Sequence, residues 1–199
     1  MRILNVGCGG TRPQGEKYVN LDNLRTQLPL GSAARDQLDS ESNYVEFDIF
    51  SGPLPFNEGD FDGVALLHCA EHFNAQDGLK LMQNCFHILK PKGVFLVSVP
   101  NASYFRHVDA EDKNENWPRL FEVTDPNNPI PTFREAALFF SQHEVLFTED
   151  ALWCYLRQAG FPAKDIKRLG SELYNPVLEE MKSLLNRIPF SLIMSALKP

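Results

Sequence analysis

The spacing at the start of the chain limits its fold more than any other feature. A short apolar run over residues 2–6 leads directly into the glycine cluster Gly7-Cys8-Gly9-Gly10, and a second run over residues 18–21 ends in Asp22. A glycine turn at the carboxyl end of a strand lets a ligand approach the backbone, and an acid at the tip of the next strand can accept both hydrogens of a ribose diol. This pair of features predicts a site for a nucleoside-type cofactor.

Strand and helix patterns alternate along the rest of the 199 residues, which predicts a parallel sheet with helices on its faces. Further strands are predicted at residues 44–47, 63–67, 94–99, 166–169 and 190–197, and helices at residues 148–158 and 176–186. Thr148 is the expected N-cap of the first of these helices, and Gly160 its stop. Pro29 and Gly31 prevent a long helix over residues 24–40.

The segment that follows the strand at residues 63–67 carries apolar residues at helical spacing: Leu79, Met82, Phe86 and Leu89. These four residues predict the buried stripe of a helix, and we expect Glu71 and His72 at its beginning. Gly93 can adopt a positive φ, so we expect it to end this helix.

Composition limits the class of protein. The chain is 43% hydrophobic and 23% charged, which suits one globular domain over residues 1–199. A net charge of −7 disfavours nonspecific nucleic-acid binding, which depends on Lys and Arg. The four cysteines form no CxxC pair, which argues against a zinc ribbon and fits the cytoplasm. We expect neither a signal peptide nor a membrane span, because no apolar stretch approaches about 20 residues.

Two common nucleotide sites do not fit the glycine cluster. The dinucleotide fingerprint needs a third glycine, but Arg12 stands at that position, and Asp22 comes only 12 residues after Gly10 instead of about 20 after the motif. A phosphate-binding P-loop needs a Gly-Lys-Ser/Thr sequence, which does not follow the cluster.

Six stretches in register resemble the class I S-adenosylmethionine-dependent methyltransferases, and most closely their small type 11-like group. They are residues 4–9, 19–22, 46–49, 54–73, 88–93 and 156–161. The resemblance implies a Rossmann-like, doubly wound, mostly parallel seven-stranded sheet with an antiparallel last strand, in a single α/β domain with an insert after strand five. It also implies S-adenosyl-L-methionine as the cofactor.

The resemblance assigns cofactor contacts by position. Gly7, Cys8 and Gly9 would let the backbone approach the methionine moiety, and Asp22 would bind the ribose hydroxyls. Asp48 would accept from the adenine amine beside Ile49, while Leu67 and His68 would form the floor below the sulfonium. Asn5 stands where many members carry Glu or Asp, and would hydrogen-bond the ammonium or orient the loop. Without the resemblance, Asp22 and Asp48 can also be strand-end caps.

Catalytic residues are less well marked. His72 and His143 are candidate bases, and packing is an equally good explanation of each. Cys8 is expected to be a small residue in a tight loop rather than a nucleophile. The irregular residues 101–131 are expected to form an acceptor lid, in which His107 and Trp117 are candidate substrate-binding residues. No convincing metal site is found in the sequence.

Oxygen on a small molecule or a sugar is the expected methyl acceptor, by analogy with relatives. The Asn/Asp-Pro-Pro-Tyr motif of the amino-directed DNA methyltransferases is absent, because residues 68–71 read His-Cys-Ala-Glu. One alternative is a catalytically inactive cofactor-binding partner subunit of a larger complex. An aminopropyltransferase is a weaker alternative, because its acidic polyamine site is not visible. The sequence predicts no oligomeric state.

Overall fold

The computed structural model describes residues 1–103, 143–171, 174–185 and 191–199. Its strands are β1 (Ile3–Val6), β2 (Tyr18–Asp22), β3 (Tyr44–Glu46), β4 (Phe61–Leu67), β5 (Leu89–Pro100), β6 (Ile166–Arg168) and β7 (Ser191–Leu197). Its α-helices are α1 (Leu24–Gln27), α2 (Ala33–Ser40), α3 (Ala75–Ile88), α7 (Glu149–Ala159) and α8 (Pro176–Lys182). The described ranges also contain two 3-10 turns, η1 (Ala70–His72) and η2 (Ala163–Asp165).

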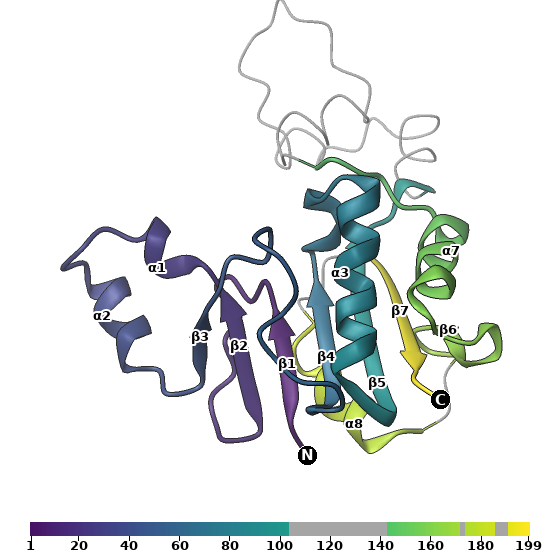
Figure 1. Ribbon diagram of the computed structural model, residues 1–199, viewed down its shortest axis with the longest axis horizontal. Coiled ribbons are helices and arrows are strands. Elements are labelled where there is room, and N and C mark those ends of the chain that lie inside the picture. Colours follow the sequence, from purple (N-terminus) through teal and green to yellow (C-terminus); the bar gives the residue numbers. More distant parts are fainter. Residues whose placement is uncertain (104–142, 172–173, 186–190) are drawn as a thin grey trace, which may run out of the picture.

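The seven strands form one sheet in the order β3-β2-β1-β4-β5-β7-β6 (Figure 1). The first five strands of this order are parallel, whereas β7 is antiparallel to both of its neighbours, β5 and β6. The predicted mostly parallel α/β sheet with a reversed last strand is therefore confirmed. The chain order changes direction between β1 and β4, and the crevice at such a switch point is where open α/β sheets bind ligands.

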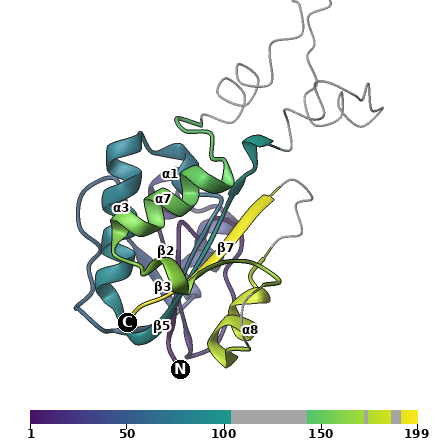
Figure 2. The same cartoon turned by 90° about the vertical axis from the view of Figure 1, so that its right-hand side faces the viewer.

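Helices cover both faces of the sheet. Figure 2 shows α3 and α7 on one face and α8 on the other. The larger apolar core lies between the sheet and the α3–α7 layer, and a second cluster joins the sheet to α8. No helix in the described ranges is long and apolar enough to cross a membrane.

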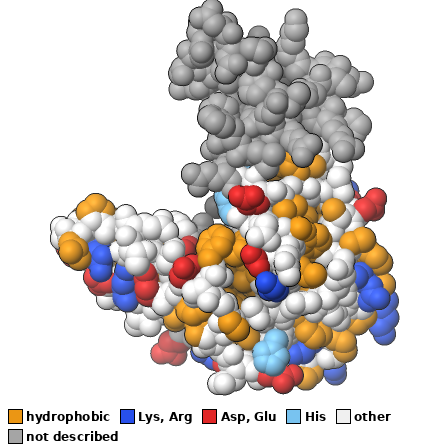
Figure 3. Space-filling view, turned by 45° about the horizontal axis from the view of Figure 1, so that its top comes forward, with side chains coloured by type: hydrophobic (Ala, Val, Ile, Leu, Met, Phe, Trp, Pro, Cys, Tyr) orange, Lys and Arg blue, Asp and Glu red, His pale blue; other side chains and the backbone are white. Residues whose placement is uncertain are grey.

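The two short helices α1 and α2 form an arm beyond the β3 edge of the sheet (Figure 1). The break predicted at Pro29 and Gly31 separates them, and Ser32 caps α2 by accepting a hydrogen bond from the Arg35 amide at 3.3 Å. Buried Leu38 attaches the arm to Tyr44. Both signs of charge are present on its surface in Figure 3.

Helix α3 corrects two expectations. It begins after the N-cap Asn74, so Glu71 and His72 lie not in its first turn but in the preceding turn η1. Its most buried residues are Gly78, Leu81, Met82, Cys85 and Ile88, whereas Leu79 and Phe86 are only partly buried. The predicted stripe is therefore displaced by one residue from the buried face of the helix. The reason is that α3 packs on α7 as well as on the sheet and so buries a wider face. Leu89 is already the first residue of β5.

Helix α7 follows the prediction closely. The Thr148 hydroxyl accepts a hydrogen bond from the Ala151 amide at 3.2 Å, and Gly160 ends the helix with a φ of 120°. At residues 90–93 the prediction was wrong, since Lys92 and not Gly93 has the positive φ. Gly93 is instead required for space, because a Cβ there would lie 2.8 Å from the Lys90 carbonyl oxygen.

Candidate functional site

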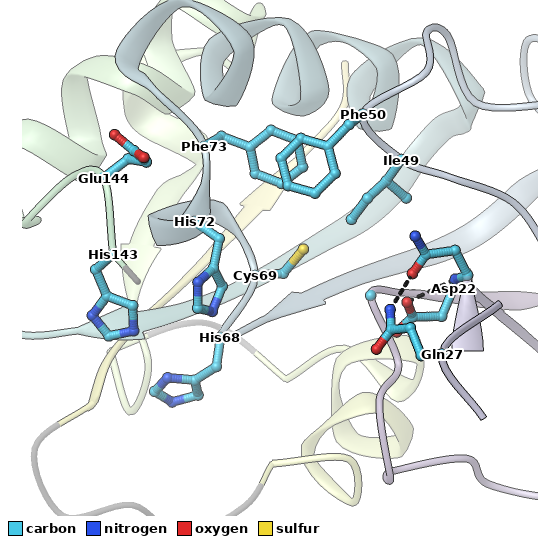
Figure 4. A pocket seen from close by; sticks show the side chains of 12 residues that line it. Asp22, Gln27, Ile49, Phe50, His68, Cys69, His72, Phe73, His143 and Glu144 are labelled. Atoms are coloured by element: carbon cyan, nitrogen blue, oxygen red, sulfur yellow. Dashed lines mark hydrogen bonds between the residues drawn. The ribbon is translucent and has the colours of Figure 1, made fainter. Parts of the chain in front are cut away.

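A cavity of about 750 Å³ opens at the carboxyl ends of β1, β2 and β4 (Figure 4). This volume lies within the range of small-molecule and cofactor sites. Its lining residues are Gly7, Asp22, Asn23, Gln27, Ile49, Phe50, His68, Cys69, His72, Phe73, His143 and Glu144. In Figure 4, Asp22 and Gln27 lie at one end of the cavity and the three histidines at the other.

The glycine loop passes close to the turn after β4. Gly7 has a φ of +62°, and a Cβ there would lie 2.6 Å from the Cys69 Sγ atom, so both conformation and space require glycine. The amides of Gly7 and Cys8 donate to the Leu21 carbonyl at 2.9 and 3.3 Å, which anchors the loop to β2. The backbone thereby forms one wall of the cavity.

Asp22 holds the loop as well as facing the cavity. Its Oδ2 atom accepts a hydrogen bond from the Gly9 amide at 2.8 Å, and its Oδ1 atom accepts one from the Asn23 amide at 2.8 Å. A carboxylate offers about four acceptor positions, so each oxygen can accept one further hydrogen from a ligand hydroxyl.

Asn5 orients the loop rather than facing the cavity. Its side chain is buried, and its Nδ2 atom donates to the Thr11 carbonyl at 2.7 Å and to the Asn20 Oδ1 atom at 3.4 Å. Of the two roles that the sequence left open, this geometry supports loop orientation.

Four more predicted contacts do not line the cavity. Cys8 is buried against Leu38, and burial raises its pKa to about 12, as expected for a packing residue. The side chain of Leu67 packs with the cluster on the α8 face of the sheet. Gly9 contacts the site through the hydrogen bond that its backbone N–H donates to Asp22. Exposed Asp48 accepts a hydrogen bond from the Phe50 amide at 3.0 Å.

Aromatic residues in the wall were missed by sequence reasoning. The rings of Phe50 and Phe73 stack with their centroids 4.2 Å apart, and Phe50 remains 63% exposed (Figure 4). An aromatic ring directly after Ile49 was the available signal. Asn23, Gln27, Cys69 and Glu144 were also missed as lining residues, because no motif marks them.

His68 is held firmly at the other end of the cavity. It has a φ of 49°, which is uncommon outside glycine and marks a constrained position. Its Nε2 atom lies 2.8 Å from the Ser191 hydroxyl and 3.2 Å from the Ser98 hydroxyl. Its Nδ1 atom lies 3.3 Å from the Glu71 Oε1 atom. These contacts fix the ring between β5, β7 and the turn η1.

His72 and His143 meet although they are far apart in the sequence. Their rings lie edge to face with centroids 4.9 Å apart, and the Glu71 carbonyl accepts hydrogen bonds from the Glu144 and Val145 amides at 2.7 and 3.2 Å. Burial lowers the pKa of His143, and His72 and His68 lower it further against the opposing effect of Glu71. The neutral imidazole is therefore favoured there.

The structure brings Gly7, Asp22, Ile49, His68, His72 and His143 together around one cavity. His107 and Trp117 lie outside the described residues, as does most of the predicted lid, residues 101–131. Their roles stay predictions.

Known proteins share both the sequence pattern and the fold. Residues 4–97 match the family profile of a methyltransferase domain. Over its whole length the chain is similar to a methyltransferase from Thermotoga maritima whose structure is described as that of a possible histamine N-methyltransferase. The two sequences are 13% identical, the TM-score is 0.57, and 82% of that chain is covered. A methyltransferase from Archaeoglobus fulgidus has 17% identity and a TM-score of 0.56, with 99% of this chain and 86% of that chain covered.

A third similar structure is a complex between the Trm112 methyltransferase activator from Haloferax volcanii and a methyltransferase. The identity is 14% and the TM-score is 0.54, with all of this chain and 82% of that chain covered. A search of curated proteins found no match. Residues 4–97 are similar to a methyltransferase domain family, and the whole chain shares the fold of S-adenosylmethionine-dependent methyltransferases, so S-adenosylmethionine is the cofactor that these similarities indicate.

Proposed function

We propose that this chain is a methyltransferase and that it transfers the methyl group of S-adenosylmethionine to a hydroxyl oxygen of a small molecule or a sugar. The observation that carries the proposal is the division of the cavity: Asp22 lies at one end, and three histidines lie at the other. The Asp22 end suits the ribose diol of the cofactor. The histidine end suits an acceptor whose proton must be removed.

The cofactor contacts follow from this orientation. The Gly7 backbone would lie against the methionine moiety, and Asp22 would accept from the ribose hydroxyls with its free acceptor positions. Ile49 and the exposed face of Phe50 offer an apolar surface for the adenine ring. Asp48, two residues before Phe50, would accept from the adenine amine.

The histidine end provides the chemistry that a hydroxyl acceptor needs. A hydroxyl is a weak nucleophile until it loses its proton, and an imidazole near neutrality can accept that proton. His72 and His143 face this end and can act directly or through an ion that they hold. Methyl transfer from a sulfonium otherwise requires alignment and the exclusion of water.

Two observations favour a small acceptor over a nucleic acid. The net charge is −7, and the turn after β4 reads His68-Cys69-Ala70-Glu71 rather than the motif that selects amino groups of bases. The alternative of an inactive partner subunit is not favoured, because the site keeps a formed cavity with titratable side chains.

The test is a screen of acceptors with S-adenosylmethionine labelled in the methyl group. Sugars, polyols and phenols represent hydroxyl acceptors, while primary amines and oligonucleotides represent the competing classes. We expect label in hydroxyl acceptors. Label in amines or oligonucleotides alone would refute the oxygen assignment. Because one similar structure contains a methyltransferase activator, the screen is repeated with the chain purified together with its native binding partners.

A further inference from the structure

Three side chains that can bind a metal ion converge at the histidine end of the cavity. One ligand atom from each of Glu71, His72 and His143 lies within 4.8 Å of the others. Glu71 and His72 come from the turn η1, and His143 comes from a segment that is docked on that turn by backbone hydrogen bonds to the Glu71 carbonyl. Figure 4 shows His72 and His143 side by side there.

Two of these side chains carry polar atoms whose hydrogen bonding is incomplete. The Glu71 side chain is 1% exposed, and neither of its carboxylate oxygens accepts a hydrogen bond in the structure as described, although Oε1 lies 3.3 Å from the His68 Nδ1 atom. The Nδ1 atom of His143 is also buried and has no hydrogen-bond partner there. A buried carboxylate without hydrogen bonds is strongly unfavourable, and such groups in native structures call for an explanation. A cation bound between them would satisfy both.

We propose that Glu71, His72 and His143 bind a divalent first-row transition-metal ion at the acceptor end of the cavity. Two imidazoles and one carboxylate suit zinc, manganese, iron or cobalt, whereas magnesium and calcium prefer oxygen ligands alone. Three protein ligands on one side leave coordination positions open toward the cavity, which is the arrangement of catalytic rather than structural sites.

The surroundings support the carboxylate in this role. His68 Nδ1 lies 3.3 Å from Glu71 Oε1, and the other ring nitrogen of His68 is held by Ser191 and Ser98. Outer partners that orient a ligating side chain are characteristic of metal sites. Bonds of about 2.0–2.2 Å place ligand atoms roughly 3–3.5 Å apart, so binding requires the three ligand atoms to move closer together than their present spread of up to 4.8 Å.

The role of this ion in catalysis rests on the proposed function, whereas its binding does not. An acceptor hydroxyl that coordinates the ion has a lowered pKa and releases its proton to water. Its oxygen then forms a bond to the methyl carbon of the cofactor. The bond from that carbon to sulfur breaks, and its electron pair stays on sulfur to give S-adenosylhomocysteine.

The test is direct metal binding by the full chain, free of any purification tag and treated with a chelator. Cobalt(II) is titrated while its visible absorption bands are recorded, and zinc is titrated by calorimetry. The variants are His143→Ala and Glu71→Gln, and His87→Ala is the control, because His87 is an exposed histidine on α3. Melting curves of the metal-free variants verify folding, and Glu71→Gln is expected to fold because it removes a buried charge.

We expect one equivalent of cobalt to bind to the wild type and to the control. Loss of a ligand in either variant should weaken binding at least about 100-fold, since even outer partners are worth 10–100-fold. Absence of cobalt and zinc binding in the wild type, or binding by a folded His143→Ala variant at wild-type strength, would overturn the proposal. Titration of the same samples with S-adenosylhomocysteine separates the metal-site proposal from the proposed function. Cofactor binding without metal binding refutes the metal site alone. Metal binding without cofactor binding refutes the proposed function alone.

Discussion

Replacement of Asp22 by alanine tests how one carboxylate serves both the loop and the cofactor. The side chain accepts hydrogen bonds from the Gly9 and Asn23 amides, both at 2.8 Å, and keeps acceptor positions for two ribose hydroxyls. Asp22→Ala removes all four interactions without adding volume. The variant should therefore lose both cofactor affinity and stability.

The two losses differ in size. A hydrogen bond to a charged group is worth about 1.5–3 kcal/mol, so losing both ribose contacts should lower cofactor affinity by at least about one to two decades. The half-buried amides of Gly9 and Asn23 can be reached by water, so losing their acceptor should cost about 1–2 kcal/mol of folding free energy. For a chain of this size that corresponds to a fall in melting temperature of roughly 2–8 °C.

Calorimetry with S-adenosylhomocysteine measures the affinity, and scanning calorimetry without ligand measures the stability. Asp36→Ala is the matched control, because Asp36 is an exposed acid on α2 away from the cavity. We expect the control to behave as the wild type in affinity. If Asp22→Ala binds the ligand within twofold of the wild type, the ribose binds elsewhere and Asp22 is only a loop anchor.

Other consequences concern packing, pH and reactivity. Gly7→Ala should destabilise the chain by about 2–5 kcal/mol, because Gly7 has a φ of +62° and the new Cβ would lie 2.6 Å from the Cys69 Sγ atom. In a double-mutant cycle measured by urea unfolding, Cys69→Ala should restore part of the lost stability. Additive effects of the two substitutions would disprove the clash. Burial acts to raise the pKa of Asp62, but hydrogen bonds from Lys90 and the Arg2 amide outweigh it and lower the pKa. The free energy of unfolding should therefore fall as pH decreases below about 4. In urea unfolding, the Asp62→Asn variant should show a smaller fall than the wild type. An equal fall would contradict a lowered pKa of Asp62 in the native state. In the native protein, iodoacetamide should rapidly modify only the exposed Cys154, whereas after denaturation it should modify all four cysteines. Mass spectrometry counts the adducts. More than one fast adduct on the native protein would show that the other three cysteines are not buried as described.

Much of the fold could be predicted because its signals are local. Thr148 and Gly160 mark the ends of α7 by their own backbone chemistry, and the short spacing from Gly10 to Asp22 requires β1 and β2 to follow almost directly. The buried face of α3 was displaced because it depends on what the helix packs against. Gly78 lies outside the predicted stripe but is buried, and a Cβ there would lie 3.9 Å from the Tyr155 ring of α7, so the second helix helps to determine which face is buried.

The site was predictable only where the sequence neighbours of a strand determine it. Gly7, Asp22 and His68 directly follow or end strands of the sheet, so topology places them together. The meeting of Glu71 with His143 could not be predicted, because it depends on backbone hydrogen bonds between segments about 70 residues apart. Asn5 turns into the loop through partners that are determined only by tertiary packing.

Calorimetric titration of the wild-type chain with S-adenosylhomocysteine measures whether the cavity binds the proposed cofactor. We predict one site with a dissociation constant in the micromolar range, as is typical of metabolite sites, and no binding of NAD. A folded protein that gives no heat with S-adenosylhomocysteine or S-adenosylmethionine, or that binds NAD equally well, would contradict the cofactor assignment and the transfer reaction built on it.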